Sequence, residues 1–221
     1  MFSNPFIRRL TLLGTPLTLT ILMLFHPWPY SNVLGQLVPI ARWWTTLHTL
    51  QFILFAFMGA AIWLLTNTLE GVAVMVSRLG ALVFVLFYNI GDVVAGISTG
   101  ILAMSIADAP TEARATAIAG AIETLFHDSV KNLFFAIGEY GWDVALVGAA
   151  VALYRAGAPR VPLLLLVLPM WLIHHDHAFP YGSLTFGCFF IVALWLELSS
   201  KSSSSPQYHP SGSSRQFSTP S

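Results

Sequence analysis

The densest group of ionisable, metal-ligating side chains in the sequence is the run His174-His175-Asp176-His177. If this run is helical, His174 and His177 share one face of the helix. Imidazole nitrogens suit Zn²⁺ and copper, and a nearby carboxylate can be a ligand or can hold a histidine ring in position. We therefore predict a divalent-metal site, although the same run is also typical of a polar loop in solvent. The candidate ligands are His26, His48, His127, His174, Asp176 and His177.

Asp92 lies inside a long apolar run, from Phe84 to Val94. A carboxylate near the bilayer centre costs at least about 2.5 kcal/mol on insertion scales, whereas an interhelical hydrogen bond in a membrane returns about 0.6 kcal/mol. Because a purely structural role offsets so little of this cost, we predict that Asp92 has a function. In a hydrolytic site either Asp92 or an acid of the segment 131–155 would act as the base.

Glu139 and Asp143 stand one helical turn apart in a segment that is otherwise apolar. If they face the same cavity, the crowded carboxylates would share protons at neutral pH. This arrangement suits a proton relay, a general acid–base pair or an oxygen-rich metal site. If the helix begins near Trp142 instead, both acids lie in interfacial water. Asp92, Glu139 and Asp143 are the candidate catalytic residues.

The composition indicates where these residues operate. Of the 221 residues, 56% are hydrophobic and 9% are charged, and the mean hydropathy is +0.72. A soluble domain carries about 25% charged residues, so this chain has too little polar surface for a water-soluble globule. The formal net charge is zero, which argues against nucleic-acid binding. The single cysteine, Cys188, excludes an intrachain disulfide.

The apolar stretches predict an all-α, polytopic transmembrane bundle over residues 1–198. A spanning helix needs about 20 mostly apolar residues. Residues 27–46 predict a loop rich in proline and aromatic side chains, and Gly96-x-x-x-Gly100 lets another helix approach closely. The number of spans is most simply six, and five or seven are alternatives. The six segments that fit a span are 9–26, 47–66, 79–104, 131–155, 161–177 and 182–198.

Two segments differ from these spans. Residues 110–130 predict an amphipathic helix on the outer membrane surface, because Pro110-Thr111-Glu112 is a start signal and the residues after it are rich in alanine. Residues 199–221 are rich in Ser, Pro and Gln and have no apolar periodicity. They predict a disordered tail.

The basic residues predict the orientation. With both termini in the cytoplasm, only Arg42, Arg114 and Lys131 lie outside, so the positive-inside rule is satisfied. Counting about 1.5 Å per residue then places the candidate residues roughly 18 to 27 Å from the inner face, in the outer half of the membrane. Short loops fit a bacterial inner membrane. The residues on the cytoplasmic side are Arg8, Arg9, Arg78, Arg155, Arg160, Lys201 and Arg215.

These features fit four functions. The leading prediction is a metal-dependent membrane hydrolase or metal-binding protein, which would use zinc or copper and act on a lipid or another membrane-soluble molecule. The same residues would serve a proton-coupled transporter or carrier. His48 and His174 would be axial ligands in a haem- or quinone-binding redox protein. A non-catalytic membrane assembly protein is the last alternative.

Overall fold

The computed structural model describes residues 4–27 and 33–202, and within these ranges every regular element is helical. The predicted all-α fold is therefore confirmed for this part of the chain. The π-helical segments are labelled η. In chain order the elements are α1 (Pro5–Arg9), η1 (Leu10–Gly14), α2 (Thr15–Leu24), α3 (Val33–Leu65), α4 (Val72–Val83), η2 (Phe84–Tyr88), α5 (Asn89–Asp92), η3 (Val93–Ser98), α6 (Thr99–Ala107), α7 (Glu112–Phe126), α8 (Ser129–Arg155), α9 (Arg160–Ile173) and α10 (Tyr181–Ser202).

Several consecutive segments join end to end into long helices. Within the described part of the chain, five of these helices are long and apolar enough to cross a membrane. Helix α9 is also apolar but has 14 residues, or about 21 Å, against a hydrocarbon core of roughly 30 Å. This architecture is compatible with an integral membrane protein. The five long helices are Pro5–Leu24, Leu34–Leu65, Val72–Ile106, Glu112–Arg155 and Tyr181–Ser199.

Helix α3 begins well before the predicted second span, so most of the predicted loop 27–46 is helical. It starts at Val33 and continues through Pro39 to Leu65 without a break. The reason is an unbroken stripe of buried residues at alternating spacings of four and three, which a helix places on one face. The proline and the aromatic residues obscured this stripe in the sequence. Its members are Leu37, Ala41, Trp44, His48, Gln51, Phe55, Met58, Ile62 and Leu65.

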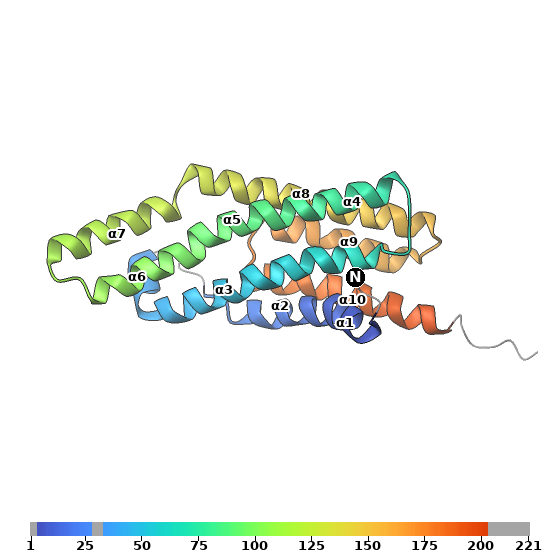
Figure 1. The fold of residues 1–221 in the computed structure, drawn as a ribbon, viewed down its shortest axis with the longest axis horizontal. Coiled ribbons are helices and arrows are strands. Elements are labelled where there is room, and N and C mark those ends of the chain that lie inside the picture. The colour runs from blue at the N-terminus through green and yellow to red at the C-terminus, as the bar shows by residue number, and fades with distance from the viewer. Residues whose placement is uncertain (1–3, 28–32, 203–221) are drawn as a thin grey trace, which may run out of the picture.

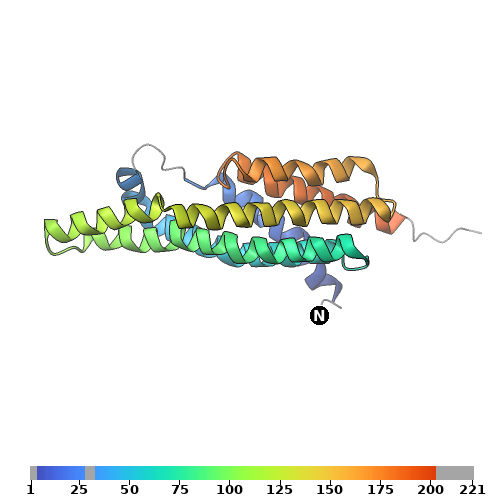
Figure 2. The same ribbon diagram turned by 90° about the horizontal axis from the view of Figure 1, so that it is seen from above.

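The segment predicted as an outer helix at 110–130 contains a helix, α7, which lengthens the bundle. Helix α7 runs alongside α6 and roughly along the long axis of the molecule (Figures 1 and 2), and only two residues separate α7 from α8. Together α6, α7 and the first part of α3 project beyond α2, α9 and α10 (Figure 1). A small core of its own holds this projection together, because Ile122 of α7 packs with Leu37, Ala41, Trp44 and Ala103.

Helix α4 packs closely along α8 because small residues line their contact. A Cβ atom added to Gly80 would lie 2.5 Å from the backbone nitrogen of Ala145, so only glycine fits there. Ser77 donates a hydrogen bond of 2.8 Å to the carbonyl oxygen of Ala145 across the same contact. This close pairing fixes α8, which carries Glu139 and Asp143, against the helix that leads to Asp92.

Two boundaries near the C-terminus also differ from the sequence prediction. Helix α9 ends at Ile173, so the run 174–177 is a turn and not part of the predicted span 161–177. Asp176 stabilises this turn, because its Oδ1 accepts a hydrogen bond of 2.7 Å from the backbone N–H of Ala178. Helix α10 continues to Ser202, past the predicted start of the tail. The rest of the predicted tail, 203–221, lies outside the described residues.

Candidate functional site

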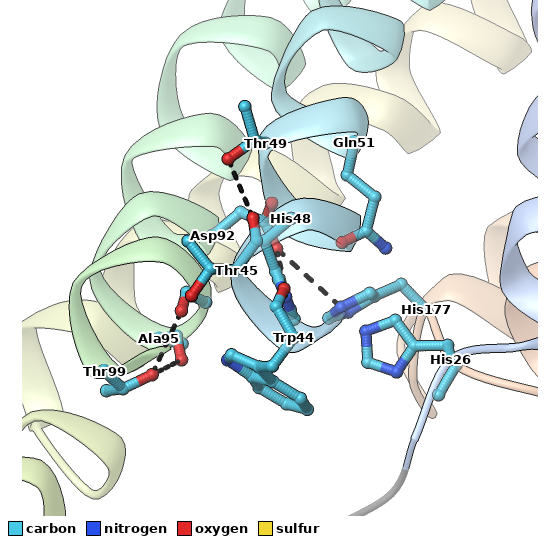
Figure 3. Close-up of polar contacts among 12 residues, drawn as sticks. His26, Trp44, Thr45, His48, Thr49, Gln51, Asp92, Ala95, Thr99 and His177 are labelled. Atoms are coloured by element: carbon cyan, nitrogen blue, oxygen red, sulfur yellow. Dashed lines mark hydrogen bonds and ion pairs between the residues drawn. The ribbon is translucent and has the colours of Figure 1, made fainter. Parts of the chain in front are cut away.

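Three of the predicted metal ligands meet inside the molecule, where α2 and α9 end. His26 follows α2, His48 lies within α3, and His177 lies in the turn after α9. One nitrogen from each ring lies within 4.8 Å of the other two. Figure 3 shows these rings gathered together, with Asp92 on the adjacent helix. We call His26, His48 and His177 the histidine cluster.

Backbone contacts orient two of the rings in the histidine cluster. Nδ1 of His26 lies 2.7 Å from the carbonyl oxygen of the next residue, and Nδ1 of His48 lies 2.7 Å from the carbonyl oxygen of Trp44. Since a carbonyl oxygen only accepts, Nδ1 donates its proton in each contact and Nε2 keeps its lone pair. Nδ1 of His177 lies 3.6 Å from Oδ1 of Asp176. Metal-binding histidines are usually held by hydrogen bonds like those of His26 and His48, whereas the separation at His177 exceeds hydrogen-bond distance.

The rings of the histidine cluster are also shielded from solvent. Nε2 of His26 and Nε2 of His177 are buried with no hydrogen-bond partner. Burial, helped by the neighbouring ring of His177, lowers the pKa of His26 to about 3. Burial also lowers the pKa of His177, although the charge of Asp176 opposes this shift. Both rings are therefore neutral at physiological pH, which is the form that binds a metal ion.

The position of His48 depends on the close approach of two helices. His48 belongs to the buried stripe of α3 and is 1% exposed. Its ring packs against Gly96 of η3, where an added Cβ atom would lie only 2.1 Å from the ring carbon Cδ2. Gly100, one turn later, meets Thr45 in the same way, with an added Cβ atom 2.2 Å from its Oγ1. The predicted Gly-x-x-x-Gly motif thus brings α3 against the helix that carries Asp92.

Asp92 lies at the edge of the histidine cluster. It belongs to α5, a single turn between the π-helical segments η2 and η3. π-Helical segments within α-helices are frequent at functional sites. Asp92 is fully buried, and neither of its carboxylate oxygens has a hydrogen-bond partner. Its Oδ1 lies 3.8 Å from Nε2 of both His48 and His177 (Figure 3).

A cavity of about 320 Å³ reaches the histidine cluster and lies in the size range of small-ligand sites. Aromatic rings form part of its wall, among them Tyr88, Phe126 and Phe135. Lys131 and Glu139 bring charged groups to the same wall. The cavity therefore has both apolar surface and polar groups that could fix the orientation of a ligand.

His174, Glu139 and Asp143 form a second group beside the cavity. Nδ1 of His174 lies 3.1 Å from Oε2 of Glu139, and its Nε2 lies 2.8 Å from Oδ2 of Asp143. Burial opposes protonation of this ring, but the hydrogen bonds and charges of the two carboxylates outweigh it and raise the pKa of His174 above 6.5. Both ring nitrogens are engaged, so neither is free to ligate a haem iron. Because α9 ends at Ile173, His174 and His177 face different neighbours rather than sharing a helical face.

The remaining predicted ligands stand apart from the histidine cluster. His127 is mostly exposed, and its Nε2 lies 3.4 Å from Oε2 of Glu123 one turn earlier on the helix. Asp176 lines the cavity, its Oδ1 lies 3.6 Å from Nδ1 of His177, and its charge also acts on His26. Among the described residues, the group whose ligand atoms lie close enough together to hold an ion consists of the three histidines and does not include Asp176.

Sequence reasoning assigned no site role to Trp44 or Lys131, which both line the cavity. Trp44 stands four residues before His48, so helical spacing alone places the two on one face. Lys131 is one of three basic residues that the predicted topology leaves on the outer side, and that exception was the available signal.

No protein-family model matches the chain, and no curated protein or solved structure matches it either. The geometry of the site is therefore the basis for a functional assignment.

Proposed function

We propose that the protein is a metal-dependent hydrolase of membrane-soluble substrates and that the histidine cluster binds one divalent ion, zinc by preference. The observation that carries this proposal is the meeting of three imidazole rings, two of them buried, beside a cavity and a buried carboxylate that has no hydrogen-bond partner. In a tetrahedral site with bonds of about 2.1 Å, two ligand nitrogens stand about 3.4 Å apart. The separation of up to 4.8 Å is wider, so the rings would have to close inward by about 1 Å to hold the ion.

A site with three histidines leaves one coordination position for water, as in catalytic zinc sites. The ion would lower the pKa of that water to about 7 and polarise the bond to be cleaved. Asp92 would take one proton from the attacking water, while the oxygen of that water bonds to the carbonyl carbon of an ester or amide. The bond to the leaving oxygen or nitrogen then breaks, and Asp92 returns the proton to that atom. The products are a carboxylic acid and an alcohol or amine.

The second group, around His174, would serve proton exchange between the cavity and solvent. Glu139 lines the cavity and contacts His174, which in turn contacts Asp143. Carboxylate and imidazole groups joined by hydrogen bonds can pass protons along such a chain. In a hydrolase this chain would carry away the proton that the carboxylic acid product releases at neutral pH.

We further propose that the protein lies in a bacterial inner membrane with both termini on the cytoplasmic side. This orientation places the cavity toward the outer side. This proposal follows from the bias of the basic residues. In support, α1 begins, α3 ends, α8 ends and α9 begins at one end of the bundle (Figure 1). His26 and His177 follow the ends of α2 and α9, so they lie away from that end. Cysteine accessibility labelling of intact cells at exposed positions of these loops tests the orientation.

The first test is the metal content of the purified full-length protein after supplementation with zinc. We expect one zinc per chain, falling at least tenfold in His48→Ala and in His177→Ala. His174→Ala and His127→Ala are the matched controls, since neither side chain belongs to the histidine cluster, and they should keep the metal. Wild-type protein that binds no zinc, copper or other divalent ion in stoichiometric amount overturns the proposal.

The second test is turnover of two fluorogenic amphiphiles, an acyl ester and an acyl amide with the same chain. We expect Asp92→Asn to keep its zinc and to lose at least about 100-fold in kcat, the lower limit for a general base. A bound metal without turnover, together with a proton flux in liposomes that Asp92→Asn abolishes, would replace the hydrolase by the proton-coupled carrier. The buried carboxylate of Asp92, which has no hydrogen-bond partner, is the observation that favours this second function.

A further inference from the structure

Lys131 places a cation in the wall of the cavity, in the first turn of α8. Although lysine is rarely buried, this residue is 8% exposed. Its Nζ donates a hydrogen bond to the carbonyl oxygen of Phe126 and lies 5.1 Å from the centre of the Phe126 ring. Asp128 accepts a hydrogen bond of 2.9 Å from the backbone N–H of Lys131 and so caps the helix. No carboxylate of the described residues lies within 4.0 Å of Nζ.

The acidic side chains of the cavity wall are already engaged elsewhere. Glu139 contacts Nδ1 of His174 at 3.1 Å. Asp176 accepts the backbone N–H of Ala178 and lies near Nδ1 of His177. An ammonium group has three N–H donors, and a buried cation is costly unless it is paired. An anionic group of a ligand in this cavity would therefore pair with the ammonium group of Lys131.

The surroundings of Lys131 indicate what kind of molecule would supply the negative charge. Asn132 follows Lys131 on the cavity wall and adds an amide group, whereas Phe126 and Phe135 add apolar surface. The cavity volume of about 320 Å³ is at the lower end of the range for ligand sites, so it suits a headgroup rather than a whole two-chain lipid. The wall combines a place for anionic oxygens with a place for the start of an apolar chain.

We propose that this cavity binds an amphiphile through an anionic oxygen group, a phosphate or a carboxylate, which Lys131 holds. For catalysis this inference rests on the proposed function, because it names the substrate class of that hydrolase: an anionic lipid-like ester or amide. The binding step itself needs only the cavity and Lys131. In the absence of such a ligand, Lys131 would only cap the carbonyl end of α7, and the two roles predict different results.

The test measures binding to the full-length protein in phosphatidylcholine nanodiscs by isothermal titration. The probes are dodecyl phosphate and sodium dodecanoate, with dodecanol as the uncharged probe of equal chain length and inorganic phosphate as the probe without a chain. We expect at least one anionic amphiphile to bind about tenfold or more tightly than dodecanol, which corresponds to about 1.4 kcal/mol. The better of the two anions identifies the headgroup chemistry. Equal affinity for both anions and dodecanol, or equal affinity for inorganic phosphate, overturns the proposal.

Variants of Lys131 separate ligand binding from a structural role. Lys131→Gln keeps an N–H donor for the Phe126 carbonyl but removes the charge, so it should remain folded and lose the preference for anions. Lys131→Arg should restore that preference. Arg114→Met is the matched control, because Arg114 is an exposed cation on α7, and it should change nothing. If Lys131→Gln keeps the preference, Lys131 is only a helix cap.

The same titration with metal-free wild-type protein, prepared with a chelator, distinguishes this inference from the proposed function. Lys131 does not belong to the histidine cluster, so the metal-free protein should still prefer the anionic amphiphile. A preference that disappears when the metal is removed and survives in Lys131→Gln would show that the metal holds the anion. In that case the metal site stands and the role of Lys131 is refuted.

Discussion

The replacement Gly96→Ala tests whether helix packing sets the metal site. The added Cβ atom would lie 2.1 Å from Cδ2 of His48, whereas ordinary carbon–carbon contacts are about 3.5–4.0 Å. The overlap is therefore at least about 1.4 Å, and either the helices separate or the imidazole ring moves by a comparable distance. Metal–ligand distances tolerate deviations of only about 0.2 Å.

We expect Gly96→Ala to lose at least tenfold in zinc content, measured by mass spectrometry of the purified protein. We also expect it to lose about 1–3 kcal/mol of stability, the usual cost of overpacking. Two controls separate these effects. Gly120→Ala on α7 meets no atom within 4 Å and should keep both stability and metal. Gly80→Ala forces α4 from α8, away from the histidine cluster, and should lose stability while keeping the metal.

The outcome of the Gly96→Ala experiment can refute the reasoning in a specific way. If Gly96→Ala binds one zinc with wild-type affinity, His48 is either not a ligand or not positioned by this contact. If Gly80→Ala loses the metal as completely as Gly96→Ala does, the loss reflects general destabilisation instead.

The remaining predictions concern ion pairs. His174 has a raised pKa, so the stability that its bonds to the two carboxylates of α8 contribute is fully present just below pH 6.5, the unfolded value, and disappears as the pH rises through the raised folded pKa. Between pH 6 and pH 9 the melting temperature should therefore fall more steeply in the wild type than in His174→Ala. Parallel curves of melting temperature against pH would contradict this prediction. Glu197 of α10 forms ion pairs with Arg8 and Arg9, and its side chain is 12% exposed. Glu197→Gln should lower the melting temperature and make it less sensitive to salt, whereas an unchanged salt dependence would show that the pairs contribute nothing.

The membrane-compatible helical architecture could be predicted from the sequence, but the helix boundaries could not. Apolar runs of about 20 residues predict helices, because in lipid the backbone N–H and C=O groups of such a run must find their partners within the same segment. The start of α3 at Val33 was missed because Pro39 and two tryptophans suggested a loop. Tertiary packing supplies the missing stability there, since Leu37 and Trp44 are buried against α6 and α7.

The sequence by itself determined which side chains are available for chemistry: histidines near the ends of apolar segments, and a carboxylate that lipid alone would not tolerate at Asp92. Only the tertiary structure decided which of them meet. His26, His48 and His177 are far apart in the chain and gather because α3 packs on glycines and α9 ends at Ile173. His174, by contrast, turns to the carboxylates of α8 although it is three residues from His177. Spacing along a helix fixes which residues share a face, whereas contacts between helices depend on where each one ends and how closely it is packed.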